Sequence, residues 1–409
     1  MTPSGGTSRR PAVCIVRQNY YPDGGHVRRN AEALATAGYD VSVLAIARPD
    51  QPPREVLNGV TVHRLPVLRK RGSLLRYAWE YGAFFVLVFF VLAALHVRKR
   101  FRVVEVDNLP DFAVFAALVP KLLGARIVFC IMDNMPELLQ IARGVGPRHP
   151  LVRILALLER ASCAFADRVV VTQDMARELI EQRGTPTGKI AVVLNGPDEA
   201  LFPPQPPRAP RTAGRDDGRF EIVTHGTLLE RFGIQTVIDA LPTIAAAVPG
   251  VRLRIVGEGE YHAALEARAA RGGVGHLVEF HGWVPVDELA DQLRGADLGY
   301  VGMLCDNMLS NKLMEYVALG VPVLLARWRL YERYFGDDAV RYFQPGDAQD
   351  LAAAVIAAHE QTRETYARAQ RASALFERYR WGVQRRVYLG VYGDLVGRAE
   401  GKWTVRTAS

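Results

Sequence analysis

The chain of 409 residues is poor in cysteine and lacks the short motifs that bind zinc or dinucleotides. Its four cysteines lie far apart and form no CxxC pair, which argues against a zinc site or a disulfide framework and favours a reducing cytoplasm. The 36 glycines follow no three-residue period, which excludes a collagen-like chain, and no GxGxxG sequence is present. We expect no secretory signal, because the apolar run at 12–16 is too short for one.

The composition is that of a globular protein with a moderate excess of positive charge. Hydrophobic residues make up 49% of the chain and charged residues 23%, which excludes a mainly disordered chain. Lys and Arg number 51 and Asp and Glu number 43, so the net charge is +8. This excess favours an anionic partner such as nucleic acid, a lipid headgroup or a phosphorylated small molecule. The basic residues form no stripe interleaved with aromatics, so we expect no nucleic-acid partner.

Short apolar runs alternate with helical patterns along the chain, which is typical of parallel sheets covered by helices on both faces. In the first half, strands are predicted at 12–17, 40–47, 103–106, 126–132, 168–171 and 189–194. In the second half, strands are predicted at 220–225, 251–256, 277–280, 297–301, 321–326 and 340–343. A proline-rich segment separates the two halves and predicts a linker.

These patterns predict an α/β fold of two doubly wound, Rossmann-like domains with parallel sheets. The carboxyl ends of both sheets are expected to face a central cleft, where ligands bind in such folds. We expect the first domain over 1–202, the linker over 203–217 and the second domain over 218–385. A C-terminal helix and tail at 386–409 are expected to cross back to the first domain.

The longest apolar run, at 81–97, reads YGAFFVLVFFVLAALHV and includes Phe84, Phe85, Phe89 and Phe90. It falls slightly short of the about 20 apolar residues that a spanning helix needs. Basic residues flank the run on both sides: Arg69, Lys70, Arg71 and Arg76 before it, and Arg98, Lys99 and Arg100 after it. Three interpretations remain open, namely a buried helix, an interfacial helix held to anionic lipid by its basic flanks, and a true span.

Loops that follow strands of the first domain carry polar residues expected to face the cleft. After the first strand, Gly24, Gly25 and His26 open a helix whose free N–H groups suit an anion, although a plain tight turn explains the glycines equally well. Two later strands are followed by polar side chains that are suited to position or deprotonate an acceptor hydroxyl: Asn108, Asp111, Asp133 and Glu137. Helix capping is the alternative for Asp111.

In the second domain, residues 310–313 begin a helix after a predicted strand, with Lys312 in its first turn. A cation is unfavourable at the positive end of a helix dipole, so Lys312 predicts a bound diphosphate there. Glu315, one turn further on, is suited to accept hydrogen bonds from two sugar hydroxyls. A solvated Lys–Glu surface pair is the alternative. Arg231 is a second candidate phosphate contact, with an ordinary surface arginine as its alternative.

Several segments in this order resemble glycosyltransferases of family 4, whose two-Rossmann architecture is called GT-B. In the first half they are YYPDGGHVRRNAEAL, DNLPDFAVFAALVPKLLGA, DNMPEL and VLNGPDEALF. In the second half they are HGTLLERFG, VGEGEY, FHGWVP and SNKLMEYVALGVPVL. The resemblance covers nearly the whole chain, and the DNLPDF and DNMPEL segments are similar to a bacterial branch of exopolysaccharide and lipid-linked glycan enzymes.

The resemblance implies a metal-independent, retaining hexosyltransferase without a cofactor. It implies transfer of a sugar from a UDP- or GDP-linked donor to a lipid-linked or growing polysaccharide acceptor, at the inner face of the cell membrane. It places the catalytic role on Asp133, Arg231 and Lys312, with basic side chains and a helix dipole neutralising the leaving diphosphate. The donor-binding positions that match the family are Gly24, Gly25, His26, Gly226, Thr227, Arg231, Val284, Ser310, Asn311, Lys312, Leu313 and Glu315. Among these, Glu315 matches the second glutamate of the family's E-x7-E pair, which holds the ribose, and the backbone near Val284 would meet the base.

The chain departs from the family's pattern at four positions. Asn307 stands where the first glutamate of the pair would fall, and Met132 stands where this branch usually has a histidine. Thr227 and Phe232 replace an arginine and a lysine, which leaves Arg231 as the only cation of that loop. These departures leave two alternatives open: a catalytically weak relative that acts as a membrane-bound assembly partner, and a nucleotide-sugar epimerase of the same architecture.

Overall fold

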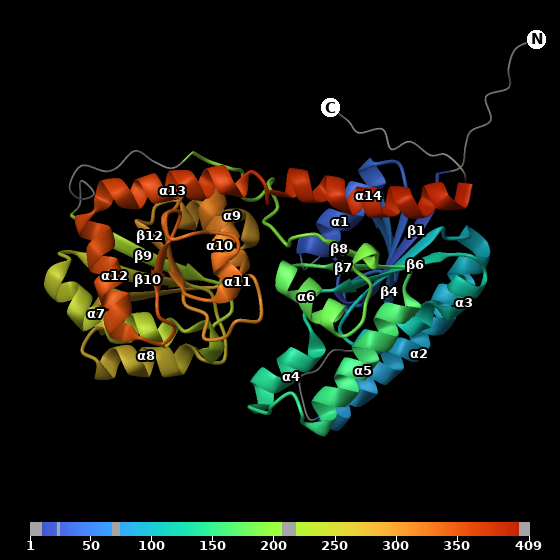
Figure 1. Cartoon of the computed structure of the whole chain (residues 1–409), viewed down its shortest axis with the longest axis horizontal. Coiled ribbons are helices and arrows are strands. Elements are labelled where there is room, and N and C mark those ends of the chain that lie inside the picture. The colour runs from blue at the N-terminus through green and yellow to red at the C-terminus, as the bar shows by residue number, and fades with distance from the viewer. Residues whose placement is uncertain (1–9, 23–24, 68–73, 207–217, 401–409) are drawn as a thin grey trace, which may run out of the picture. The chain divides into compact units, whose positions relative to one another are not determined.

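The computed structural model describes residues 10–22, 25–67, 74–206 and 218–400. The chain divides into two compact units, one made of Met1–Leu194 together with Gln384–Ser409 and the other of Asn195–Val383. Each unit is a predominantly parallel sheet with helices packed against it (Figure 1). The predicted α/β class with two doubly wound domains is therefore confirmed.

The first unit is built on an eight-stranded sheet with the strand order β3-β4-β2-β1-β5-β6-β7-β8. Its strands are β1 (Ala12–Tyr20), β2 (Asp40–Ile46), β3 (Arg54–Leu57), β4 (Val60–Leu65), β5 (Val103–Asp107), β6 (Arg126–Ile131), β7 (Arg168–Val171) and β8 (Ile190–Val192). Its helices are α1 (Gly25–Thr36), α2 (Leu74–Lys99), η1 (Asp111–Ala117), α3 (Leu118–Leu122), α4 (Met135–Arg143), α5 (Pro150–Phe165), α6 (Asp174–Gln182), η2 (Thr187–Lys189) and α14 (Trp381–Glu400). Central β5 is buried at every position because helices cover both faces of the sheet, and its three valines share this burial with Glu105 and Asp107.

The hairpin formed by β3 and β4 is not predicted by the patterns described above. The two strands pair antiparallel, whereas the other neighbouring strands of the sheet are parallel. Asn58 and Gly59 join them with φ angles of +47° and +80°. Positive φ at both central residues is the requirement of a type I′ turn, and Asn-Gly is its preferred sequence.

The second unit is built on a six-stranded parallel sheet with the strand order β11-β10-β9-β12-β13-β14. Its strands are β9 (Phe220–His225), β10 (Val251–Val256), β11 (Val278–Gly282), β12 (Leu298–Val301), β13 (Val323–Ala326) and β14 (Arg341–Phe343). Its helices are η3 (Glu230–Phe232), α7 (Ile234–Ala247), α8 (His262–Arg271), η4 (Gly275–Leu277), α9 (Val286–Leu293), α10 (Asn311–Ala318), α11 (Arg329–Glu332), α12 (Ala348–Glu360) and α13 (Thr362–Phe376). The predicted strands of this half match the observed ones to within two residues at each end.

The boundaries between the units differ from the predicted ones. The first unit ends at Leu194 rather than at 202, because the segment that follows packs within the second unit. The Glu199 carboxylate accepts a hydrogen bond of 2.8 Å from the backbone N–H of Gly382 in that unit. The chain returns to the first unit at Gln384, within α14, and most of the predicted linker at 203–217 lies outside the described residues.

The apolar segment expected at 81–97 lies within α2, and its two faces have different surroundings. Phe84, Val88 and Leu92, spaced four residues apart, are buried in the core of the first unit. Phe84 therefore belongs to the core and not to a lipid-facing surface. Phe85 and Phe89 are partly buried against the same core.

The opposite face of α2 is apolar and exposed. Trp79 is 75% exposed, Phe90 64% and Val97 59%. The helix is long and apolar enough over Trp79–Lys99 to cross a membrane, judged by length and composition only, and 28% of its most apolar window is buried. The helix thus combines a core-facing side with an unpartnered apolar side. The expected basic residues Arg69, Lys70 and Arg71 lie outside the described residues.

Candidate functional site

In the second unit, a charged cluster forms where β9 ends and α10 begins. His225 is the last residue of β9 and is buried, and its Nε2 lies 2.6 Å from Oε2 of Glu315 on α10. Its Nδ1 lies 2.9 Å from the hydroxyl of Tyr316. The same Tyr316 hydroxyl donates to the backbone carbonyl of Val223 at 3.1 Å, so Nδ1 meets a hydroxyl oxygen that is itself held in place. The ring thereby orients the Glu315 carboxylate, whose Oε1 has no hydrogen-bond partner among the described residues.

Lys312 and Arg231 are brought to the same aromatic ring. The Lys312 ammonium lies 4.7 Å from the centroid of the Phe232 ring, and the Arg231 guanidinium carbon lies 5.3 Å from it. Burial lowers the pKa of Lys312 to about 8, since the charged form loses solvation there. Two cations gathered at the start of α10, where the helix dipole is already positive, form a cradle suited to a multiply charged anion.

The glycine at the end of β9 makes room for this lysine. Gly226 has a φ of +98°, and a Cβ on it would lie 3.4 Å from Cε of Lys312. Gly257, with a φ of +138°, packs backbone against backbone, because a Cβ there would lie 2.1 Å from the Gly226 carbonyl oxygen. These glycines therefore allow the loops after β9 and β10 to pack closely, which is a structural role distinct from a dinucleotide motif.

The other donor-binding residues predicted in this unit differ in their surroundings. Ser310 is at the N-cap position of α10, but its side chain makes no capping hydrogen bond. Leu313 is buried, whereas Asn311 is exposed and its Oδ1 accepts a bond of 3.4 Å from Asn195. The remaining two positions are exposed and half-buried, respectively: Thr227 and Val284.

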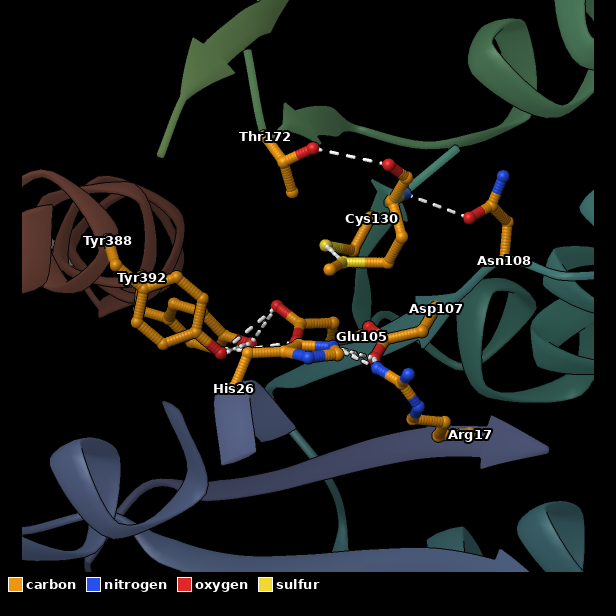
Figure 2. A network of polar contacts seen from close by, with 10 residues as sticks. Arg17, His26, Glu105, Asp107, Asn108, Cys130, Thr172, Tyr388 and Tyr392 are labelled. Atoms are coloured by element: carbon orange, nitrogen blue, oxygen red, sulfur yellow. Dashed lines mark hydrogen bonds and ion pairs between the residues drawn. The ribbon is translucent and has the colours of Figure 1, made fainter. Parts of the chain in front are cut away.

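In the first unit, polar side chains gather at the carboxyl ends of β1 and β5 (Figure 2). Arg17 donates to Oδ2 of the buried Asp107 at 3.3 Å and also contacts His26. Burial, together with the charge of Arg17, lowers the pKa of His26 to about 4, so its ring is neutral at physiological pH. Of the three residues predicted around this loop, Gly25 begins α1, His26 is engaged by Arg17 and Asp107, and Gly24 lies outside the described residues.

Asn108 links the two acceptor-side loops. Its Nδ2 donates to Oδ1 of Asp111 at 3.0 Å and to the backbone carbonyl of Asp133 at 2.6 Å. Its Oδ1 accepts a bond of 2.8 Å from the backbone N–H of Met132. Burial raises the pKa of Asp111 to about 7, so its proton is available near neutral pH. The structure thus brings together three of the four predicted acceptor-side residues through one amide side chain.

The fourth, Glu137, is held by an arginine that the sequence analysis does not single out. Arg183 forms ion pairs with Glu137 and with the buried Glu159, at 2.6 Å for the latter. Asn134 donates to the other oxygen of Glu159 at 3.0 Å. Glu137 is therefore committed to a structural ion pair, which reduces its capacity to act on an acceptor.

A buried carboxyl lies beside this polar edge, on β5. Both oxygens of Glu105 accept hydrogen bonds of 3.1 Å from the Tyr388 hydroxyl, and Tyr392 donates to it at 2.7 Å. Figure 2 shows the two tyrosine rings of α14 pointing at this carboxyl, next to Asp107. Burial raises the pKa of Glu105, and the neighbouring charge of Asp107 acts in the same direction.

Sequence reasoning missed His225 and Arg17 as members of these clusters. Each is a polar residue in the second half of a strand, and this is the signal that could have found them. The tyrosines of α14 gave no such signal, because Tyr388 meets Glu105 over 283 positions of sequence. In the described ranges, no group of three or more His, Cys, Asp or Glu is arranged to hold a metal ion.

Comparisons with known proteins agree with both halves of this arrangement. Residues 24–196 match the family described as "Glycosyl transferase 4-like domain", and residues 219–361 match "Glycosyl transferases group 1". The chain is 26% identical over 382 residues to the phosphatidyl-myo-inositol mannosyltransferase of Mycolicibacterium smegmatis, covering 91% of this chain and 90% of that protein. It is also 26% identical over 336 residues to WcaI of Escherichia coli, named as a colanic acid biosynthesis glycosyl transferase, covering 75% and 81% of the two chains.

Solved structures show the same fold. Sucrose-phosphate synthase from Thermosynechococcus elongatus is similar with a TM-score of 0.76 at 17% identity, over 95% of this chain and all (100%) of that one. HepE of Anabaena in complex with UDP-glucose is similar with a TM-score of 0.68 at 18% identity, over 94% and 99% of the two chains. The family matches cover β2 to β8 of the first unit and all six strands of the second, and these neighbours share the two-sheet architecture. The chain belongs to the GT-B glycosyltransferases of family 4 and is an enzyme of the hexosyltransferase type.

Proposed function

We propose that the protein transfers a sugar from a UDP- or GDP-linked donor, without a metal ion and with retention of configuration. The observation that carries this proposal is the cluster at the start of α10. There, the side chains of Lys312 and Arg231 lie near the Phe232 ring. Glu315, one helical turn after Lys312, is oriented by His225. The cluster supplies separate groups for the two parts of a nucleotide sugar, namely cations for its diphosphate and a carboxylate for its ribose.

The diphosphate is the leaving group of such a reaction and gains negative charge as the sugar departs. Lys312, Arg231 and the N–H groups at the start of α10 neutralise this charge, which lowers the barrier most if they are already in place. The free Oε1 of Glu315 accepts hydrogen bonds from the ribose hydroxyls, while His225 holds Oε2. HepE in its complex with UDP-glucose is a structural neighbour that binds a donor of this class.

The acceptor in our proposal is a lipid-linked or growing polysaccharide, bound by the first unit. Asn108, Asp111 and Asp133 form the hydrogen-bonded group suited to hold the acceptor hydroxyl. Of these three residues, Asp133 is the one to which we assign the catalytic role. A lipid-linked acceptor is supported by the exposed apolar face of α2 and by the mannosyltransferase relative, whose name states a phosphatidylinositol substrate. The enzyme would then act in the cytoplasm, bound peripherally at the inner face of the cell membrane.

The test is a panel of nucleotide sugars with the purified enzyme in the presence of a metal chelator. A true donor at 100 times its Kd should stabilise the fold by about 2.7 kcal/mol, seen as a raised Tm. The product with a lipid-linked acceptor is then examined by NMR for the configuration of the new glycosidic bond. Loss of transfer in the chelator, an inverted product, or epimerised sugar without transfer would each contradict the proposal.

A further inference from the structure

A pocket of about 390 Å³ lies at the edge of the first unit's sheet opposite to the acceptor-side loops. It is formed where β1 begins, where α2 ends and where the chain enters β5 and β6. Its wall is basic: within the described part of the chain no carboxylate lines it, and the lining includes Arg10, His96, Lys99, Arg100, Arg102 and Leu123. None of the donor-side or acceptor-side clusters contributes to it.

His96 is the buried polar group of this pocket. It is 2% exposed, and neither of its ring nitrogens has a hydrogen-bond partner among the residues that the structure describes. A buried imidazole with two unmet nitrogens costs stability unless something bonds to it. Burial and the charge of Arg100 lower the pKa of His96, which favours its neutral form.

Arg100 adds a second, independent observation. It follows the last residue of α2 with a φ of +55°, in the left-handed region that a helix end normally gives to glycine. A bulky residue there costs roughly 1 kcal/mol or more, and such strain is typical of functional positions. The helix dipole favours a cation at this end, but Lys99 already meets that need and is paired with Asp40 at 3.1 Å.

The surface around the mouth of the pocket is apolar. Leu123 lines the pocket and is 50% exposed, and its neighbour Leu122 is 76% exposed. Val97, one turn before Arg100 on α2, is 59% exposed. Val97 and Leu122 each adjoin a pocket-lining residue in the sequence, His96 and Leu123, so a ligand whose charged group enters the pocket has exposed apolar side chains available for its apolar part.

We propose that this pocket binds the phosphate group of an anionic membrane lipid, with its arginines and His96 as donors and the apolar rim against the acyl region. Guanidinium groups and an imidazole N–H match phosphate oxygens in charge and geometry. The lipid as the source of the phosphate rests on the proposed membrane location. The pocket would fix the orientation of the first unit on the bilayer, in addition to the less specific attraction of its basic residues.

Two variants at the C-terminal end of α2, each of which removes one positive charge, distinguish binding in this pocket from general electrostatic attraction. Arg100→Gly removes a pocket arginine and suits the left-handed backbone, so its Tm should equal or exceed that of the wild type. Arg98→Ala removes an exposed charge of the same helix that does not line the pocket. Inorganic phosphate is titrated into each full-length protein, and the histidine ring signal that disappears in His96→Gln is followed by NMR.

We expect phosphate to shift the His96 signal saturably in the wild type and in Arg98→Ala. Arg100→Gly should weaken this binding at least about tenfold. Equal phosphate binding by Arg100→Gly and the wild type, or no response of His96 in the wild type, would overturn the pocket assignment.

The lipid source is tested with vesicles of phosphatidylcholine, with and without phosphatidylglycerol. Each variant loses one charge, worth about fivefold in binding to the anionic vesicles, so any excess loss in Arg100→Gly reports the pocket. An excess of about tenfold supports the proposal. Equal losses in the two variants overturn the lipid as the ligand. Phosphate binding without any vesicle binding of the wild type instead overturns the membrane location and leaves a soluble phosphate as the source.

Discussion

The imidazole of His225 lies 2.6 Å from the carboxylate of Glu315, although 90 positions separate the two residues in the sequence. One is the last residue of β9 and the other lies in the second turn of α10, so the contact ties a helix to the strand beside it. The Tyr316 hydroxyl holds the second ring nitrogen at 2.9 Å. The direction of the Glu315 carboxylate therefore depends on a ring that is itself fixed on both sides.

Replacing His225 should weaken donor binding through Glu315. We expect His225→Asn to raise the KM for the donor about fivefold to tenfold and to change kcat less, since it disturbs binding more than the leaving group. Glu315→Ala should cost more, about 1.5–3 kcal/mol of donor affinity. Because the two residues are in contact, the double variant should show a coupling of at least about 0.5 kcal/mol. The control is His281→Asn, which replaces an exposed histidine of the same unit. Additive effects of His225→Asn and Glu315→Ala in the double variant would refute the coupling.

Neutralisation of the leaving diphosphate should depend more on Lys312 than on Arg231. Lys312 is partly buried and packed against Phe232, whereas Arg231 is exposed. We expect Lys312→Ala to lower kcat about a hundredfold and Arg231→Ala to lower it less. Steady-state kinetics at saturating donor measure both. Wild-type kcat in both variants would place the diphosphate elsewhere.

The reaction should lose efficiency in alkaline solution because Lys312 has a pKa lowered to about 8 by burial. The free enzyme loses this positive charge as the pH rises through that value, and kcat/KM reports the free enzyme. We therefore expect kcat/KM to fall above about pH 8. Lys312→Arg keeps its charge to higher pH, so its profile should lose this limb. The same limb in both proteins would assign the titration to another group.

The stability of the first unit should fall as the pH rises, because of Glu105. Burial raises the pKa of this carboxyl, so the folded unit keeps its proton where the unfolded chain has lost it. The stabilisation is complete below the ordinary glutamate pKa of about 4.3 and is lost as the pH climbs toward the raised value. In mildly alkaline buffer, the free energy of opening of β5 should therefore be about 1–3 kcal/mol higher in Glu105→Gln than in the wild type.

Hydrogen exchange of the peptide 103–107, compared between the two proteins at each pH, measures this effect. Glu181→Gln removes a carboxylate that pairs with Arg177 at 3.0 Å on the surface of the same unit, and it serves as the control. A difference between Glu105→Gln and the wild type that does not change with pH would contradict the prediction.

The two faces of α2 should respond differently to the same substitution. Phe84 is 1% exposed and Phe90 is 64% exposed on one helix. We expect Phe84→Ser to destabilise the first unit by about 3–5 kcal/mol, as expected for a large core truncation. Phe90→Ser should change stability by less than about 0.5 kcal/mol but weaken sedimentation with anionic liposomes. If Phe90→Ser bound liposomes as the wild type does, the exposed face would have no membrane role.

The sequence was informative where structure is encoded locally. Short apolar runs located nearly all parallel strands, and Lys312 at a helix start pointed to the cluster that includes Arg231 and Glu315, because a cation is out of place there. The hairpin at Asn58 and Gly59 was missed because its edge strand β3 lacks the apolar run by which the other strands were located. Its Asn-Gly pair is nevertheless the preferred sequence of a type I′ turn and could have indicated the hairpin.

The contacts that complete each cluster were beyond reach from the sequence. Glu315 was correctly placed near Lys312, but its partner His225 comes from another strand, and no spacing rule connects them. In the same way, Glu137 looked free for an acceptor until Arg183 was found to hold it. Local patterns identify which groups are present, whereas tertiary contacts decide which of them are already occupied.

Because the chain returns to the first unit through α14, the two units cannot complete their folding in the order in which they are synthesised. The first unit begins with residues that leave the ribosome early, yet the partners of its buried Glu105 are Tyr388 and Tyr392, near the end of the described chain. Domains usually fold as they emerge, with the N-terminal one first. Here Glu105 of the first unit lacks its tyrosine partners until the whole second unit has been synthesised. The second unit is therefore the first that can fold completely.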